Sequence, residues 1–600
     1  MRKILLLEPN YKNKYPPMGL MKLATYYRER GEDVRFFKGD LKNFAVTLLL
    51  EEYLLEVEDA TLIKNSSKLF EYIKTGKYAP IESIQNFKES ENGSLLKQYR
   101  KKYVAEEYPH FDIVCITTLF TFYWKKTIET INFAKKFLTK KGKIIVGGIS
   151  SSILPNRIFD ETEIKPVVGQ LDKPGILDAD SDVIIDELPL DYSILEEIDY
   201  KYPANNAYFA YMTRGCPNRC TFCAVPKLEP VYCNYISLKP QLDKANLIFG
   251  AQKDLLLMDN NVLASNCFDK IIDEIKECGF ERGAMYTPPN EYEIVINNLK
   301  ENRNIRAYTK KMIEIYDHIT EKLPEEEQGN FYSKRKRANL LYSLYATTEA
   351  IFEFDKIAHP LYNKLFKFRP RRRYVDFNQG VDSRFMTEAK MKKISEINIR
   401  PLRIAFDHYS MKDKYIKAVK MASKYDIRNL SNYLLYNFKD TPEELFYRMQ
   451  LNIDLCEQLD VKIYSFPMKY HPIDEPNYFN NREYIGMYWN RKFIRSIQSV
   501  LNSTKGKVGK GRPFFEEAFG KDIEDFKKIL WMPETFIIHR TKYKNNLTAE
   551  WWEKFNALND KQSNKIKSII KNNHFTDEYY NIKDKKILNV LEYYKIKYEQ

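Results

Sequence analysis

The stretch that decides the fold reads Thr213-Arg214-Gly215-Cys216-Pro217-Asn218-Arg219-Cys220-Thr221-Phe222-Cys223. Its three cysteines have the spacing C-x3-C-x2-C, and the tight turns favoured by Gly215 and Pro217 fold the loop around one metal centre. Structural zinc normally takes four ligands and leaves no position open. Three thiolates therefore favour a cluster with one exchangeable iron. The alternative is a closed site with Cys233 as fourth ligand, which would indicate a structural or binding protein rather than an enzyme.

A series of strand and helix patterns surrounds this loop. Short apolar runs predict strands at Ala207–Met212, Asp254–Met258, Tyr374–Phe377, Leu402–Phe406, Leu430–Leu435 and Lys462–Pro467. Helical patterns lie between most of them, so the series predicts an open or partial barrel with its chemistry at the strand ends. A charged, Tyr-rich helical insertion interrupts the series at 281–372, and an insertion of this kind indicates a lid or a substrate-binding element.

The chain before residue 150 has a second α/β pattern. It predicts strands at Lys3–Leu7, Val34–Phe37, Asp112–Thr117 and Lys143–Val146, separated by helical segments. Such alternation is typical of a parallel, doubly wound sheet that binds ligands at the carboxyl ends of its strands. Residues 151–200 read as a connecting segment with a strand at Val183–Ile185, and the chain from 477 onward reads as helical and basic.

The loop with its three cysteines resembles the hallmark C-x3-C-x-aromatic-C of the radical S-adenosylmethionine (SAM) superfamily, and Phe222 supplies the aromatic residue. The resemblance covers about residues 200–475. It implies that Cys216, Cys220 and Cys223 hold a 4Fe-4S cluster whose fourth iron is chelated by SAM. It further implies that an electron from a reductant such as ferredoxin or flavodoxin cleaves SAM to methionine and a 5'-deoxyadenosyl radical, which abstracts hydrogen from a substrate.

The resemblance also implies that polar residues at the strand ends bind SAM. Family members usually end the second strand with a Gly-Gly-Glu-like turn, whereas this chain has Asp259, Asn260 and Asn261, similar to an Asp-Asp-Asn variant found beside cobalamin-type domains. Asp259 could accept from the SAM ammonium and the two amides could donate to its carboxylate. The remaining candidates follow the third, fourth and fifth strands, and turn or capping roles explain each of them equally well: Asn378, Asp382, Asp407 and Asn437. Asn437 is the one expected to be most free to reach a ligand.

Residues 1–150 resemble the cobalamin (B12)-binding-like domain that precedes many radical SAM cores. The resemblance lies in Pro16-Pro17-Met18-Gly19-Leu20, in the strand Asp112–Thr117 and in the Gly147-Gly148 turn. The chain has no histidine before His110, so the loop that supplies a histidine ligand to cobalt is absent. Relatives either bind cobalamin without that histidine or keep only the sheet, and both readings stay open. Thr117, Thr118, Gly147 and Gly148 would border the ligand.

Together these patterns predict an α/β protein with an N-terminal Rossmann-like doubly wound parallel sheet, a partial (β/α)6 radical SAM barrel, a helical insertion and a mainly helical C-terminal region. The predicted boundaries are 1–150 for the cobalamin-binding-like domain, 151–200 for the connecting segment, 201–280 and 373–476 for the barrel, 281–372 for the insertion and 477–600 for the tail. The predicted function is that of a radical SAM enzyme of unknown substrate and net reaction, with or without cobalamin-dependent methyl transfer.

A tRNA methylthiotransferase is an alternative enzyme class. The resemblance rests on Thr213-Arg214-Gly215-Cys216 and Thr221-Phe222-Cys223-Ala224-Val225-Pro226. Those enzymes resemble a core preceded by a domain with three more cluster cysteines, but residues 1–200 contain only Cys115. We therefore rank this alternative low.

The 600 residues carry a formal charge of +14, and the last 110 hold 23 basic and 14 acidic residues. This balance permits a nucleic-acid partner, including at the basic loop Lys505–Pro513, but a solvated Lys-rich surface is favoured. Arg371-Arg372-Arg373 precedes the third predicted strand and is expected to face the mouth of the active site. The chain lacks an apolar run of about 18 residues and a signal-peptide pattern, so we expect a cytoplasmic protein without a membrane contact.

Overall fold

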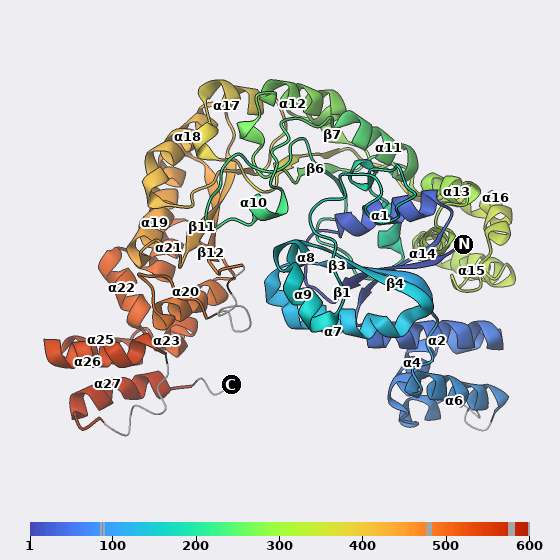
Figure 1. Cartoon of the computed structure of the whole chain (residues 1–600), viewed down its shortest axis with the longest axis horizontal. Coiled ribbons are helices and arrows are strands. Elements are labelled where there is room, and N and C mark those ends of the chain that lie inside the picture. Colours follow the sequence, from blue (N-terminus) through green and yellow to red (C-terminus); the bar gives the residue numbers. More distant parts are fainter. Residues whose placement is uncertain are drawn as a thin grey trace.

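The computed structural model describes residues 1–600 except 85–86, 88–89, 474, 476–482, 510, 574–581 and 598–600. Figure 1 shows the chain as an arch. The N-terminal sheet lies at one foot, the second series of strands crosses the top, and the C-terminal helices form the other foot. The fold is α/β with parallel sheets, as the alternating patterns predict.

The N-terminal sheet has four parallel strands in the order β2-β1-β3-β4. The strands are β1 (Lys3–Pro9), β2 (Asp33–Gly39), β3 (Phe111–Thr118) and β4 (Leu138–Gly148). Side chains alternate along the central strand, so Ile4 and Leu6 join the core under α1 (Met18–Glu29). Leu5 and Leu7 join the core under α2 (Leu41–Val57) and α7 (Trp124–Ala134) on the other face. The continuous apolar run of β1 is therefore explained by burial on both faces.

The second series consists of six parallel strands. Two three-stranded sheets contain β5 (Ala207–Ala210), β6 (Asp254–Leu257) and β9 (Val375–Phe377), then β10 (Leu402–Arg403), β11 (Asn429–Tyr436) and β12 (Lys462–Lys469). Single bridges join Val375 to Ile399 and Val381 to Ile404, so the strands follow one another in sequence order. The helices along the outer side are α11 (Lys239–Phe249), α12 (Phe268–Ile275), α17 (Glu388–Ile394), α18 (Lys412–Lys424) and α19 (Pro442–Leu459).

The predicted strand at Val183–Ile185 is wrong. Residues 181–184 form no regular element, and a 3-10 turn follows at Ile185–Glu187. Only Ile185 of this apolar run is buried, against the core under α1, whereas Val183 is 39% exposed. Asp186 is held by ion pairs to Lys22 and Arg214. The segment therefore buries one anchoring side chain on α1 instead of extending a sheet.

The insertion forms a helical unit with its own core. Its helices are α13 (Glu291–Lys300), α14 (Ile305–Lys322), α15 (Glu325–Arg337) and α16 (Thr348–Leu365). Their apolar faces pack together around Tyr316 and Phe354. The short antiparallel strands β7 (Met285–Tyr286) and β8 (Arg371–Arg372) pair with each other where the chain enters and leaves the insertion.

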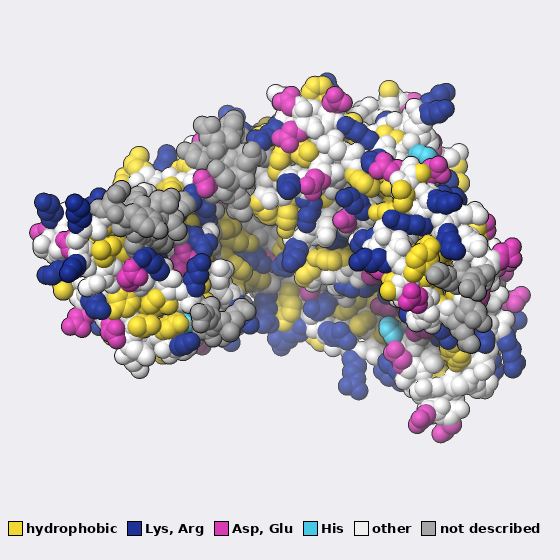
Figure 2. All heavy atoms as spheres, turned by 90° about the horizontal axis from the view of Figure 1, so that it is seen from below, with side chains coloured by type: hydrophobic (Ala, Val, Ile, Leu, Met, Phe, Trp, Pro, Cys, Tyr) yellow, Lys and Arg dark blue, Asp and Glu magenta, His cyan; other side chains and the backbone are white. Residues whose placement is uncertain are grey.

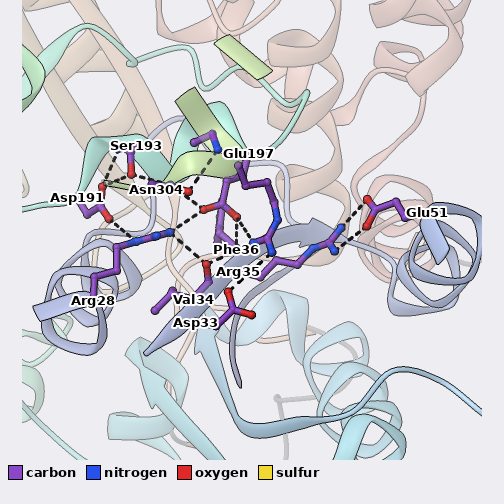
Figure 3. A network of polar contacts seen from close by, with 12 residues as sticks. Arg28, Asp33, Val34, Arg35, Phe36, Glu51, Asp191, Ser193, Glu197 and Asn304 are labelled. Carbon is purple, nitrogen blue, oxygen red and sulfur yellow. Dashed lines mark hydrogen bonds and ion pairs between the residues drawn. The ribbon is translucent and has the colours of Figure 1, made fainter. Parts of the chain in front are cut away.

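A buried polar junction joins the N-terminal domain, the connecting segment and the insertion (Figure 3). The carboxylate of Glu197 accepts from Arg28 at 2.9 Å, from the backbone amide of Phe36 at 2.7 Å and from Asn304 at 2.9 Å. Arg28 also pairs with Asp191 at 3.0 Å. Because the Glu197 side chain is only 1% exposed, its bonds fix three parts of the chain at one point.

The tail after residue 490 is helical in its described parts. Its longer helices are α20 (Arg491–Ser503), α21 (Arg512–Phe519), α22 (Ile523–Trp531), α25 (Leu547–Asn556), α26 (Asp560–Lys571) and α27 (Lys585–Lys595). Helices α21 and α22 pack against α19, with Phe446 in contact with Phe515 and Phe526. Lys510 of the basic loop lies outside the described residues. Among the described helices, none is both long enough and apolar enough to cross a membrane.

Candidate functional site at the carboxyl ends of the strands

The cysteine loop begins where β5 ends, and Gly215 fixes its path. Gly215 has φ +70°, and a Cβ there would lie 2.6 Å from the carbonyl oxygen of Val231 and 2.9 Å from that of Glu229. Only glycine fits this approach. The preceding Arg214 pairs with Asp186 at 2.7 Å and with Glu229 at 2.9 Å, and it lies 3.9 Å from the ring centre of Tyr211. The start of the loop is thereby held rigidly.

The three thiols of the loop are half-buried. Burial raises the pKa of Cys223, and the neighbouring Cys220 and Cys216 raise it further. Asn261 donates to the sulfur of Cys216 at 3.4 Å, and Arg384 donates to the sulfur of Cys220 at 3.9 Å. The loop thus presents three sulfurs beside a neutral amide donor and a cationic one.

Within the described residues, no three His, Cys, Asp or Glu side chains gather closely enough to hold a metal ion. A single tetrahedral zinc ion, with Zn–S bonds of about 2.3 Å, needs its thiolates about 3.8 Å apart. A four-iron cluster is larger, so its cysteine ligands stand farther apart than those of one ion. Cys233, the alternative fourth ligand, donates its thiol to the carbonyl oxygen of Tyr235 at 3.6 Å, while its backbone pairs with Arg214.

The three polar residues after β6 have different roles. Asp259 is buried and accepts from the backbone amides of Met212 and Thr213 and from the Thr213 hydroxyl at 2.6 Å. Burial raises the pKa of Asp259 to about 6. Its carboxylate therefore shapes the cysteine loop. Asn260 donates to Glu229 at 2.7 Å, whereas the side-chain oxygen of Asn261 is buried without a hydrogen-bond partner in the described chain.

Among the residues after β9, Asp382 and Arg384 contact the cysteine loop. Asp382 accepts from Asn218 of the loop at 2.9 Å and pairs with Arg384 at 2.7 Å. This pair orients the guanidinium that reaches Cys220. Asn378 is buried, and its side-chain oxygen accepts from the hydroxyl of Tyr15 in the N-terminal domain. Of these two predicted site residues, Asp382 contacts the cysteine loop, whereas Asn378 contacts the N-terminal domain.

An aromatic group lies on the other side of the loop. The ring of Phe222 meets His408 at 5.7 Å and Phe438 at 5.8 Å between ring centres, both edge to face. Burial raises the pKa of the neighbouring Asp407 to about 6 and lowers the pKa of His408. Asp407 lies close enough to the loop for its charge to raise the pKa of Cys223. The fully buried Asn437 is not free, because its side-chain amide bonds the backbone of Tyr470, Tyr484 and Gly486.

A buried ion pair that the sequence patterns did not predict lies on the inner face of the strands. Arg403 of β10 donates to both oxygens of Asp376 of β9, at 2.8 Å and 2.7 Å, and its third contact is Ser431 of β11. Ser431 of β11 pairs in register with Tyr464 of β12, and Tyr433 of β11 pairs with Phe466 of β12. The signal for this pair was present, since each strand has one charged residue between apolar neighbours, Val375-Asp376-Phe377 and Leu402-Arg403-Ile404.

The carboxyl end of the N-terminal sheet approaches the same region. Helix α8 (Ile149–Ile153), which follows β4, contacts α10 (Val225–Leu228), which follows the cysteine loop. At the point between β1 and β3 where a ligand would enter, Tyr11 stacks on Tyr123 at 4.7 Å and bonds the Thr127 hydroxyl at 2.6 Å. Tyr11 is buried. Tyr11 and Tyr123 therefore occupy the space between the carboxyl ends of β1 and β3.

The expectation that Arg371-Arg372-Arg373 faces the mouth of the site is wrong. These residues precede β9, so they lie at the amino ends of the strands, opposite the cysteine loop. Arg373 is held over Phe280, 3.8 Å from the ring centre, and donates to the carbonyl oxygens of Gln252 and Lys253. The insertion leaves and returns at this same end through β7 and β8, a placement that does not suit a lid over the loop.

Comparison with known proteins adds no family. No protein-family model matches the chain, and no curated protein is significantly similar to it.

Proposed function

We propose that this chain is a radical SAM enzyme whose six parallel strands form a partial (β/α)6 barrel. The observation that carries the proposal is the loop Cys216–Cys223 at the carboxyl end of the first strand, with three half-buried thiols and a conformation that only a glycine at position 215 permits. Three thiolates leave one position open to a ligand that also binds the protein. Three half-buried thiols with one coordination position left open favour a 4Fe-4S cluster over a closed single-ion site.

In this proposal Cys216, Cys220 and Cys223 hold the cluster, and two neighbouring side chains hold the amino-acid end of SAM. The unpartnered oxygen of Asn261 supports a role as acceptor for the SAM ammonium, because a buried oxygen without a partner is costly. Arg384 supports a role as donor to the SAM carboxylate, as a planar guanidinium suits a carboxylate. The aromatic group of Phe222, His408 and Phe438 would cover the adenine.

Once bound and given an electron by an external donor such as ferredoxin or flavodoxin, the cluster and SAM would supply hydrogen-atom abstraction from a substrate. The side chains of the protein hold the bound groups in position and keep solvent away from them. Asp259 fixes the loop through the amides of Met212 and Thr213, and Asp382 fixes Arg384. The inner face of the strands, with the Asp376–Arg403 pair and Tyr433, is the surface on which a substrate would lie.

The proposal does not include cobalamin. The crevice between β1 and β3 is filled by Tyr11 and Tyr123, and its neighbourhood has no histidine before His110. These observations support the reading in which the N-terminal sheet serves as a scaffold beside the barrel. Cytoplasmic location and the absence of a membrane partner remain part of the proposal and rest on the sequence.

The test is anaerobic reconstitution of the full chain with iron and sulfide, followed by reduction with SAM present. We expect about four irons per chain and release of 5'-deoxyadenosine. Cys220→Ala should lose both the iron and the product. Asn261→Ala should keep the iron but bind SAM more weakly, which separates cluster binding from SAM binding.

Cys233→Ala is the matched control, because this cysteine lies on the same loop region but bonds Tyr235. It should keep both cluster and product. Loss of the metal in Cys233→Ala, with one zinc in place of iron in the parent chain, would instead establish the closed, non-enzymatic site.

A further inference from the structure

A cavity of about 370 Å³ lies at the amino ends of the strands, on the side of the strands opposite the cysteine loop. Its walls come from the segments that immediately precede β7, β9, β10 and β11. The side chains that matter for the argument are Arg282, Arg372, Arg400, Arg428, Asp426 and Tyr374. Four guanidinium groups therefore share one cavity with a single carboxylate, which leaves an excess of three positive charges.

The one carboxylate is already engaged. Asp426 pairs with Arg282 at 2.7 Å and with Arg428 at 3.1 Å. Arg428 also donates to the carbonyl oxygen of Leu459 at 2.7 Å, so its position is fixed from two sides.

The other two arginines have no acidic partner within the described chain. Arg400 donates to the hydroxyl of Tyr374 at 3.0 Å and lies 5.1 Å from the centre of that ring. Arg372 makes no side-chain hydrogen bond or ion pair there, although it sits on a paired strand that fixes its backbone. Like charges held together repel, and an anion in the cavity would relieve this repulsion.

The chemistry of the walls selects the kind of anion. Guanidinium groups present planar pairs of N–H donors that match the oxygens of a phosphoryl group, and they remain charged at every physiological pH. Tyr374 with Arg400 against its ring adds a flat surface next to the charges. Such a site suits a phosphoryl group better than a lone carboxylate, because the net charge of +3 on the lining side chains exceeds the charge of one carboxylate.

We propose that this cavity binds a phosphoryl group, brought either by a small phosphate ester or by the backbone of a single-stranded nucleic acid. The site is separate from the cysteine loop and does not depend on the enzymatic function proposed above. It also gives a role to Arg372, which belongs to the basic run that does not face the cysteine loop.

The test is calorimetric titration of the full chain, without iron or SAM, with inorganic pyrophosphate, ATP and a single-stranded RNA of about 20 nucleotides. Arg372→Ala and Arg400→Ala should each weaken binding about tenfold or more. Arg371→Ala is the matched control, because Arg371 is the neighbouring residue of β8, is exposed like Arg372 and does not line the cavity. It should bind as the parent chain does.

Comparison of the three probes identifies the source of the phosphoryl group. Saturable binding of pyrophosphate or ATP that RNA does not exceed would indicate a small ester. Tighter binding of RNA would indicate a nucleic-acid backbone, provided that its logarithmic salt dependence becomes shallower by about 0.7 for each phosphate that Arg372→Ala no longer neutralises.

Two outcomes would overturn the proposal. One is the absence of binding by all three probes at millimolar concentration. The other is an equal loss of binding in Arg371→Ala and Arg372→Ala, since a diffuse surface charge would then account for it. Unchanged circular dichroism and unchanged iron reconstitution in the variants show that the fold and the cysteine loop are intact.

Discussion

At the scale of single residues, Lys492 is an amine enclosed by the C-terminal helices. It is buried in α20, and its ammonium donates to the carbonyl oxygen of Met532. Burial lowers the pKa of Lys492 to about 7, and the nearby charge of Glu534 offsets only part of this effect. In the unfolded chain the amine keeps its usual pKa of 10.5. The folded chain therefore binds fewer protons than the unfolded chain between these values.

This difference gives a prediction about pH. Because the unfolded state binds the extra proton, the free energy of unfolding of the parent chain should rise with pH between about 7 and 10.5. Lys492→Met removes the titrating group and keeps the volume. Its stability relative to the parent should be higher by a few kcal/mol near pH 6 and should shrink toward zero by about pH 10. Melting curves of both chains across this range measure it, and a difference that does not change with pH would contradict the assigned burial.

The residues of the candidate site differ in how far the sequence predicts their roles. The three cysteines and the need for Gly215 follow from spacing and turn chemistry, and the loop has the expected tight turn. The separate roles of the polar residues do not follow from the sequence. Asp259 and Asn437 were placed at strand ends as ligand-binding candidates, but the fold uses both to hold backbone amides and carbonyls. Which partner a polar side chain finds depends on loops far away in the sequence, and periodicity carries no information on that.

At the scale of elements, helix α19 shows how one buried charge organises several strand ends. Arg448 is fully buried and donates to the carbonyl oxygens of Phe406 and Asp407 after β10 and of Leu435 in β11. It also pairs with Asp440 at 3.1 Å. The sequence does signal this role, because Arg448 shares the apolar face of α19 with Leu445 and Met449.

We predict that Arg448→Met lowers the free energy of unfolding by about 3–5 kcal/mol, because Asp440 is then buried without its counter-charge. The double variant Arg448→Met with Asp440→Asn should recover part of the loss, since the buried charge is gone as well. Urea unfolding of the parent, both single variants and the double variant gives the coupling. If the losses of the two single variants simply add, the pair does not stabilise these strand ends as described.

Strand positions were more predictable than connections. The strands of both series were readable because buried parallel strands are continuous apolar runs. The prediction of a strand at Val183–Ile185 is wrong for the same reason. Three consecutive apolar residues have the same pattern whether they pair with another strand or pack one side chain against a helix. The side on which the insertion docks was not readable, because it is set by the pairing of β7 with β8.

At the scale of the whole molecule, Glu197 connects parts of the chain that are far apart in sequence (Figure 3). Glu197→Gln keeps the shape but places an N–H group against the donors of Arg28, Phe36 or Asn304. We predict a lower melting temperature and faster proteolysis within 281–372, because a buried donor left unpaired costs about 1–3 kcal/mol.

Glu51→Gln is the control for this prediction. Glu51 of α2 pairs at 2.7 Å with Arg35, which lies on β2 next to Phe36, but the side chain of Glu51 is 36% exposed. Removing a pair that solvent reaches should change stability by less than about 1 kcal/mol. Equal effects of the two substitutions would show that the junction at Glu197 does not hold the insertion in place.

The hollow of the arch is lined by apolar side chains and edged by Lys and Arg (Figure 2). Strand β12 presents Tyr464, Phe466 and Met468 with exposures of 40%, 36% and 49%. In the described sheet, β12 pairs only with β11, so its other edge could recruit a strand from a second molecule. Pro467 removes one donor from that edge, Lys462 and Lys469 put charge at both ends, and Gly509 brings a loop against Ile463. The chain can thus expose the aromatic side chains of β12 to water without pairing edge to edge with other copies of itself.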